Sequence, residues 1–343
     1  MALLPGKPRE ARRLDMATKD SSVQLTNLPA GVPPTVRAAF APANDEASAE
    51  AYTRELAHSH YENFSVVSRL LPRHLRQDFC NVYSFCRIAD DLGDEVHNPS
   101  LSLQLLADFR RQTLACYAGD CQTAVFTALS RTIKRWDIPA RPFLDLIDAF
   151  EQDQRVTRYA TFDQVLDYCR RSADPVGRLV LYMGGYRDEQ RQRLSDQTCS
   201  ALQLVNFWQD VRRDITDRDR VYLPQDSMDR FGVTVEQLRQ GRFDSYYRDL
   251  LEFECQRCSA MFAKGRQLLP LIRPSLRPQI TLFSLGGEAV LRAIRRKGYD
   301  TLTTRPSLSK ATKARLMLLA IWGMALAAIA PGRSVAVPQG GSA

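Results

Sequence analysis

Apolar residues recur at spacings of three and four along most of this chain, and no run of segments alternates between apolar and polar residues. Spacings of three and four gather apolar side chains on one face of an α-helix, whereas alternation marks a half-buried strand. The stretch from Arg73 to Val96 shows the helical pattern, with apolar positions at Leu75, Phe79 and Val82. There is also no repeat of fixed length. The sequence therefore predicts a single all-α domain.

Helix boundaries follow from the prolines and from one capping motif. Pro142 suits the first turn of a helix, where a missing N–H costs nothing. Thr161 to Gln164 has the form of a capping box for a helix that runs to Met183. A break is expected at residues 220–224. Helices are predicted over residues 73–96, 101–117, 124–136, 143–156, 162–183, 189–216, 245–269, 277–297 and 309–330.

Both ends of the chain lack the helical pattern. Residues 1–45 contain six prolines and no apolar period, so we expect a disordered N-terminal extension. Residues 46–330 form the expected all-α catalytic domain, and residues 331–343 a flexible tail. The apolar run 316–330 would span ~22 Å as a helix, which is short for a bilayer. We expect a cytoplasmic protein, with peripheral membrane association through this run as the alternative to a buried core helix.

The charge and the cysteines limit the function classes. The net charge of +8 favours an anionic partner such as nucleic acid, an acidic membrane or a polyphosphate. Basic residues are scattered and are not interleaved with aromatics, which argues against nucleic acid. No secretory signal opens the chain, so the eight cysteines are expected to be reduced thiols. The pair Cys255 and Cys258 is weak evidence for a zinc site.

A first acidic cluster lies near the end of the segment 73–96. Asp90 and Asp94 are four residues apart, so on a helix their carboxylates share one face, and Arg87 lies on the same side. Buried carboxylates without a counter-charge would cost several kcal/mol each. A divalent cation with hard oxygen ligands, such as Mg²⁺, removes that cost.

A second cluster comprises Asn206, Asp210 and Asp214, which form an oxygen-bearing stripe over ~12 Å of helix. The helix around this stripe is apolar on nearly all sides up to Val211, which predicts that it is buried. A polar stripe on a buried helix is best explained by an internal cavity. Either cluster alone would equally suit a solvated surface, but the two together favour a metal site.

With these motifs, the sequence resembles the squalene and phytoene synthase family of head-to-head prenyl synthases, from about His58 to Lys313. The resemblance also includes residues 60–64, 168–177, 220–224 and 298–300. It implies an isoprenoid synthase fold with a central cavity, two or three Mg²⁺ ions and a long-chain isoprenoid diphosphate as substrate. The implied metal ligands are Asp90, Asp94, Asn206, Asp210 and Asp214. The implied substrate contacts are Arg87, Tyr61, Phe64, Tyr168, Asp174, Gln209, Tyr299 and Arg305.

Two departures from the condensing members of the family are informative. Gln209 stands where they usually carry Arg, and the run from Ser172 to Arg178 contains Asp174 where they usually carry Gly-Thr before Val-Gly. Gln lacks the charge of a bidentate Arg. These features resemble bacterial hydroxysqualene synthase of the hopanoid pathway. The resemblance implies presqualene diphosphate as substrate, hydroxysqualene as product, and neighbouring pathway enzymes as partners.

The chemistry implied by this resemblance needs an apolar tunnel and one ordered water. Asp174 or Gln209 is the hypothesised positioner of that water. No Gly-rich dinucleotide fingerprint appears, and no nicotinamide cofactor is expected. A condensing synthase acting on two prenyl diphosphates is the alternative enzyme, and a nucleic-acid-binding helical protein or an inactive scaffold is the alternative class. The candidate tunnel walls are Phe64, Tyr83, Phe85, Tyr182, Phe207 and Trp208.

Overall fold

The computed structural model describes residues 32–40, 42, 45–60, 71–309 and 312. Regular structure in these residues consists of helices, together with two isolated β-bridges, so the predicted all-α fold is confirmed. The first half contains α1 (Pro34–Ala39), α2 (Glu46–His60), η2 (Arg73–Leu75), α4 (Arg76–Asp94), α5 (Pro99–Tyr117), α6 (Ala124–Trp136), α7 (Arg141–Asp153), α8 (Phe162–Ser172) and α9 (Asp174–Met183). The second half contains α10 (Glu189–Arg218), α11 (Gln225–Phe231), α12 (Val235–Gln240), α13 (Ser245–Gly265), η3 (Arg266–Leu271) and α14 (Arg277–Arg296).

Most predicted helices appear within a few residues of their expected bounds, and α6 matches in full. The predicted helix over 162–183 is wrong in one respect, because it divides at Ala173 into α8 and α9. The cause is Pro175, which lacks the N–H that a continuing helix would need. At the start of α8 the Thr161 side chain accepts from the Gln164 N–H at 3.3 Å, as the capping box predicts.

Part of the expected N-terminal extension is ordered. Pro34 occupies the first position of α1, where its fixed φ favours a helix. Val36 and Phe40 are then buried in the core, and the Phe40 ring meets the edge of the Phe109 ring. Six residues of helix are enough to bury two large side chains, and a count of prolines does not reveal this. Residues 1–31 lie outside the described part of the chain, as do the tail 331–343 and all of the predicted helix 309–330 except residues 309 and 312.

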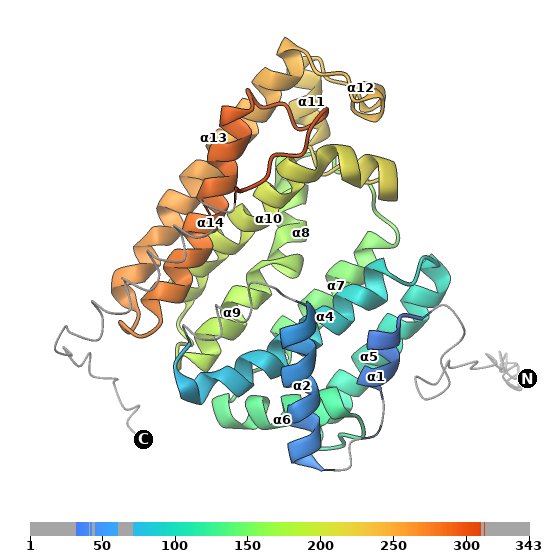
Figure 1. The fold of residues 1–343 in the computed structure, drawn as a ribbon, viewed down its shortest axis with the longest axis vertical. Coiled ribbons are helices and arrows are strands. Elements are labelled where there is room, and N and C mark those ends of the chain that lie inside the picture. Colours follow the sequence, from blue (N-terminus) through green and yellow to red (C-terminus); the bar gives the residue numbers. More distant parts are fainter. Residues whose placement is uncertain (1–31, 41, 43–44, 61–70, 310–311, 313–343) are drawn as a thin grey trace, which may run out of the picture.

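Figure 1 shows the helices as two groups. Helices α1, α2 and α4–α7 lie together on one side, and α10, α13 and α14 lie on the other, with α8 and α9 between them. Each group has a large apolar core of its own, one centred on Phe85 and Phe109 and the other on Trp208 and Tyr247. Helix α10 packs against α8, α9, α13 and α14, so it is the central element of the fold.

Two further observations bear on the sequence predictions. All eight cysteines are free, as expected for reduced thiols. Within the described ranges, every helix is too short or too polar to cross a lipid bilayer.

Candidate active site

The two acidic clusters meet in one polar cavity of about 230 Å³ between α4 and α10. Asp90 and Asp94 reach it from the last turns of α4, and Asn206, Asp210 and Asp214 reach it from α10. The structure therefore brings together all five residues predicted as metal ligands. The other residues in the wall are Phe150, Asp153, Tyr168, Ser172, Gln203, Phe207, Arg218, Arg220 and Tyr222.

Close packing of α4 against α7 sets the position of the first cluster. A Cβ atom at Gly93 would lie 3.1 Å from Cδ1 of Phe150, so glycine permits this approach. The Gln154 side chain donates to the Gly93 carbonyl oxygen at 2.8 Å, which satisfies a backbone acceptor in the last turn of α4. The cavity wall formed by α4 and α7 is thus fixed by backbone contacts next to the carboxylates.

Arginines compensate several of the carboxylates. Asp94 accepts from Arg218 at 2.8 Å and from Arg220 at 3.1 Å. Arg220 is nearly buried and also donates to the Asp153 backbone carbonyl oxygen at 3.1 Å. Its guanidinium nitrogen lies 3.7 Å from a carboxylate oxygen of Asp153. These arginines bring positive charge into the cavity beside the acidic groups.

Two more arginines form ion pairs with carboxylates at the edge of the site. Arg87 lies 2.5 Å from the buried Asp91 carboxylate and 3.4 Å from Asp90. Both the Nε and the terminal nitrogen of Arg305 donate to Asp210. A bidentate guanidinium–carboxylate pair of this kind also matches the geometry of a phosphate group. Arg87 and Arg305, the predicted diphosphate contacts, thus pair with Asp90 and Asp210, which line the polar cavity.

Burial and mutual repulsion raise the pKa values of the acidic side chains. Desolvation, followed by the Asp94 charge, raises the pKa of Asp90 to about 6. Desolvation and then Asp210 raise the pKa of Asp214 to about 7. Burial also raises the pKa of Asp153 to about 7, although Arg220 opposes it. A divalent cation would relieve this repulsion, since it favours the ionised carboxylates.

The donor set suits Mg²⁺, because carboxylate and amide oxygens are the hard ligands that this ion prefers. Within the described residues, no three acidic, His or Cys side chains converge closely enough to enclose an ion by themselves. Magnesium commonly keeps waters and substrate phosphate oxygens in its octahedron. These oxygen donors therefore suit a magnesium ion only if it takes part of its coordination from other ligands.

Sequence reasoning missed several cavity residues, of which Asp153 is the most informative. The Tyr168 hydroxyl donates to the Asp153 carboxylate at 2.6 Å, which places the predicted substrate residue Tyr168 in the cavity wall. Arg218 follows Asp214 by four residues, so the helical spacing was a usable signal. Asp153 is at the end of α7 and had no such signal, because only the fold brings α7 to this cavity.

Three predicted substrate residues lie away from the polar cavity. Tyr299 borders a separate cavity between α13 and α14, and its hydroxyl donates to Glu252 at 3.0 Å. Asp174 is buried and accepts from the Ser200 hydroxyl at 2.7 Å. The geometry does not support a diphosphate contact by Tyr299. Tyr61 and Phe64 lie outside the described residues.

Gln209 is also buried away from the cavity, and its role in the structure is to hold the chain after α14. Its side-chain amide donates to the Pro306 backbone carbonyl oxygen. The next residue on α10, Asp210, pairs with Arg305. Two adjacent residues of α10 therefore fix two adjacent residues of the segment 301–309.

An apolar cavity of about 330 Å³ lies along the same two helices. On α4 its wall residues Phe79, Tyr83 and Cys86 continue the face that reaches Asp90 and Asp94. On α10 the face runs from Ser195, Cys199 and Leu202 to Asn206 with the same spacings. Cys86 and Asp90 are one helical turn apart, or ~6 Å along the axis. The remaining wall residues are Val82, Val176, Gly177, Val180, Met183, Thr198, Leu268, Ile280 and Phe283.

Only some of the residues predicted to form tunnel walls border a cavity. Tyr83 lines the apolar cavity and Phe207 lines the polar one. Phe85 and Trp208 are fully buried core side chains, and Tyr182 packs against the core. Periodicity identified these aromatics as buried but did not tell which of them border a cavity.

Comparisons with known proteins agree with this arrangement. A family model described as squalene/phytoene synthase matches residues 57–312. A phytoene synthase from Thermus thermophilus is 32% identical over 80% of this chain and 93% of its own. A hydroxysqualene synthase from Rhodopseudomonas palustris is 33% identical over 73% of this chain and 82% of its own.

Solved structures show the same fold. The crystal structure of squalene synthase HpnC from Alicyclobacillus acidocaldarius superposes with a TM-score of 0.71 and 45% identity, covering 74% of this chain and 96% of that one. A dehydrosqualene synthase superposes with a TM-score of 0.74 at 23% identity, covering 82% of this chain and 98% of its own, and this likeness concerns the fold alone.

Proposed function

The chain belongs to the squalene and phytoene synthase family, and from that premise we propose that it ionises a long-chain isoprenoid diphosphate between α4 and α10. One observation carries the proposal. The same faces of α4 and α10 are apolar at one end and acidic at the other, over two cavities in succession. A substrate with a hydrocarbon chain and a diphosphate end matches both chemistries.

We propose Mg²⁺ as the cofactor, held by the five predicted ligands of α4 and α10. When bound, it supplies Lewis-acid charge at the leaving diphosphate. The side chains of Arg87, Arg218, Arg220 and Arg305 now pair with carboxylates. In the loaded site they are positioned to donate charge-assisted hydrogen bonds to the diphosphate oxygens. The apolar walls exclude bulk water from the cation that ionisation leaves behind.

The finer proposal is that the substrate is presqualene diphosphate. Its ionisation, rearrangement and capture by one water would yield hydroxysqualene, diphosphate and a proton. Two findings support this branch. The chain is 45% identical to a squalene synthase and 33% identical to a hydroxysqualene synthase. Gln209 is also uncharged and donates to Pro306, so it does not supply the positive charge that an Arg at this position would carry.

Asp174 is the candidate for positioning the water. It lies in the chain between Ser172, which borders the polar cavity, and Val176, which borders the apolar one. Burial raises its pKa to about 8, so at neutral pH it carries a proton. If Asp174→Ala and Gln209→Ala left the alcohol product and its rate unchanged, neither residue would take part in water capture.

A condensing synthase is the second candidate, favoured by the 32% identity to a phytoene synthase over most of both chains. Product analysis separates the two. Purified protein with Mg²⁺ and no nicotinamide receives farnesyl diphosphate or presqualene diphosphate, and products are identified by gas chromatography and mass spectrometry. We expect only presqualene diphosphate to be consumed, with an alcohol as product. Consumption of farnesyl diphosphate to a cyclopropyl diphosphate would instead establish the condensing reaction.

A further inference from the structure

The turn between α5 and α6 brings two cysteines together. Helix α5 ends at Tyr117, and Gly119 adopts a φ of 90°, which favours glycine. The Gly119 N–H donates to the Cys116 carbonyl oxygen at 3.1 Å, and the Asp120 N–H donates to that of Ala115 at 2.9 Å. This pair of hydrogen bonds is a Schellman motif. It reverses the chain so that Cys121 returns to the end of α5.

The two thiols differ in their surroundings. The Cys121 Sγ lies 4.0 Å from the Cys116 carbonyl oxygen and is partly exposed. Cys116 is buried, and its Sγ donates to the Phe126 carbonyl oxygen at 3.5 Å. The neighbouring Cys116 side chain is the largest cause that lowers the pKa of Cys121, to about 7. Ser130 and the Lys134 charge lower it further, while burial and Asp120 oppose them.

The other cysteines are poor thiolates. Burial raises the pKa of Cys80 to about 11 and that of Cys86 and Cys199 to about 12. Burial also raises the pKa values of Cys169 on α8 and of Cys255 and Cys258 on α13. Since the thiolate is the reactive form, the lowered pKa and the partial exposure of Cys121 favour it as the attacking thiol.

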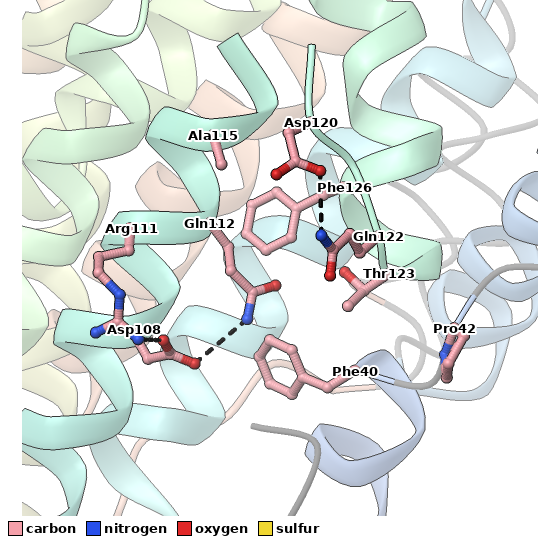
Figure 2. Close-up of a pocket in the computed structure, with 10 residues that line it drawn as sticks. All are labelled: Phe40, Pro42, Asp108, Arg111, Gln112, Ala115, Asp120, Gln122, Thr123 and Phe126. Atoms are coloured by element: carbon pink, nitrogen blue, oxygen red, sulfur yellow. Dashed lines mark hydrogen bonds and ion pairs between the residues drawn. The ribbon is translucent and has the colours of Figure 1, made fainter. Parts of the chain in front are cut away.

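The turn also lies beside open space. It borders a surface cavity of about 510 Å³, and Figure 2 shows Asp120, Gln122 and Thr123 on one side of it with Phe40 and Gln112 opposite. A Cβ atom at Gly119 would meet no atom within 4 Å. The residues on either side of Cys121 therefore border open space.

We propose that Cys121 and Cys116 are a reactive thiol pair, which a small-molecule disulfide converts reversibly to an intrachain disulfide. The Cys121 thiolate attacks the small disulfide, forms a mixed disulfide and releases one small thiolate. Cys116 then gives up its proton and attacks the Cys121 sulfur, which expels the second small thiol. The two protein thiols are oxidised, and the small disulfide is reduced to two thiols.

The proximity of the two cysteines favours this order of events. The neighbouring Cys121 side chain is the largest cause of the raised pKa of Cys116. Once Cys121 is capped, its negative charge is gone, and Cys116 loses its proton more easily. The inference does not depend on the proposed reaction of the polar cavity, because neither cysteine lines that cavity.

The first test measures thiol reactivity in the native protein with a chromogenic aromatic disulfide. We expect one fast phase, removed in Cys121→Ser and unchanged in the control Cys86→Ser, since Cys86 is also partly exposed but is not a thiolate. A fast phase that persists in Cys121→Ser would overturn the assignment.

The second test uses oxidised glutathione and intact mass. The wild type should lose two hydrogens and keep no glutathione, whereas Cys116→Ser and Cys116→Ala should accumulate one glutathione at Cys121. Reduction with dithiothreitol should restore the starting mass in each. Equal glutathione adducts on wild type and variants would show that Cys116 does not resolve the mixed disulfide, and the pair would be rejected.

Discussion

At the scale of single residues, the site is a balance of carboxylates and guanidinium groups in a small cavity. Asp94 illustrates this balance, because it lies between Arg218 and Arg220 and also repels Asp90. Removing one charge from such a group leaves its neighbours without a partner, and that usually costs more than the pair contributed. Effects on activity should therefore be large at these positions and small at exposed carboxylates.

Asp94→Asn should lower kcat/KM by at least ~10–100-fold, the loss typical even of residues behind a metal ligand. It should also raise the Mg²⁺ concentration needed for half activity, because the amide is a weaker ligand. The matched control is Asp163→Asn, an exposed carboxylate in the first turn of α8. Steady-state kinetics over a Mg²⁺ titration measure both values, and an unchanged Mg²⁺ requirement would exclude Asp94 as a ligand.

Asp174 gives a pH dependence of stability with a defined sign. Burial raises its pKa from 3.8 to about 8, so between these values the folded protein keeps a proton that the unfolded chain has lost. The free energy of unfolding therefore falls as pH rises through this window, by up to ~1.4 kcal/mol per pH unit.

Asp174→Asn removes this titration and should flatten the dependence on pH. Urea unfolding at pH 5, 7 and 9 measures the difference between wild type and variant. We expect the variant to gain stability relative to the wild type as pH rises. Parallel curves for the two proteins would mean that Asp174 titrates normally.

At the scale of elements, small residues set how closely the helices approach α10. A Cβ atom at Gly287 of α14 would lie 2.4 Å from Cζ of Phe262 and 2.8 Å from Cδ2 of Leu202. Leu202 borders the apolar cavity, so this contact links the packing of α14 to that cavity. Gly177 has a similar role on α9, where Ser195 and Cys199 leave no space for a methyl group.

Neighbouring glycines of α14 offer a matched pair. Gly287→Ala should destabilise the protein by ~1–3 kcal/mol, because an extra methyl in a packed contact forces its neighbours to move. Gly286→Ala has no atom within 4 Å of the new methyl and should stabilise the helix by up to ~1 kcal/mol. Denaturant unfolding measures the change in stability of both variants. Equal changes would show that Phe262 and Leu202 can move aside without cost.

At the scale of the whole molecule, two apolar cores flank one central helix, and the cavities lie where the two groups of helices meet. The apolar cavity and the polar cavity would have to act together on one long substrate. Altering the apolar cavity should therefore affect the hydrocarbon chain and spare the diphosphate.

Cys86→Phe places a ring in the cavity of about 330 Å³, one turn from Asp90. Activity on the long substrate should fall at least ~10-fold, roughly the discrimination that one or two methylenes of pocket space provide. Inhibition by inorganic diphosphate should change little. Cys86→Ser keeps the volume and is the control. If diphosphate inhibition weakened as much as activity, the cavity would not be a separate hydrocarbon site.

The sequence alone determined the fold class and identified the two acidic clusters. Helical periodicity is local, and carboxylates four residues apart share a face in any helix, so Asp90 with Asp94 and Asp210 with Asp214 could be recognised without coordinates. The break at Ala173 was missed, although Pro175 signalled it. Tertiary structure decided the rest. Asp153 joins the cavity because α7 packs against α4, and Tyr299 is turned away because α13 lies beside it. Such placements depend on contacts between residues far apart in the chain, which no local pattern records.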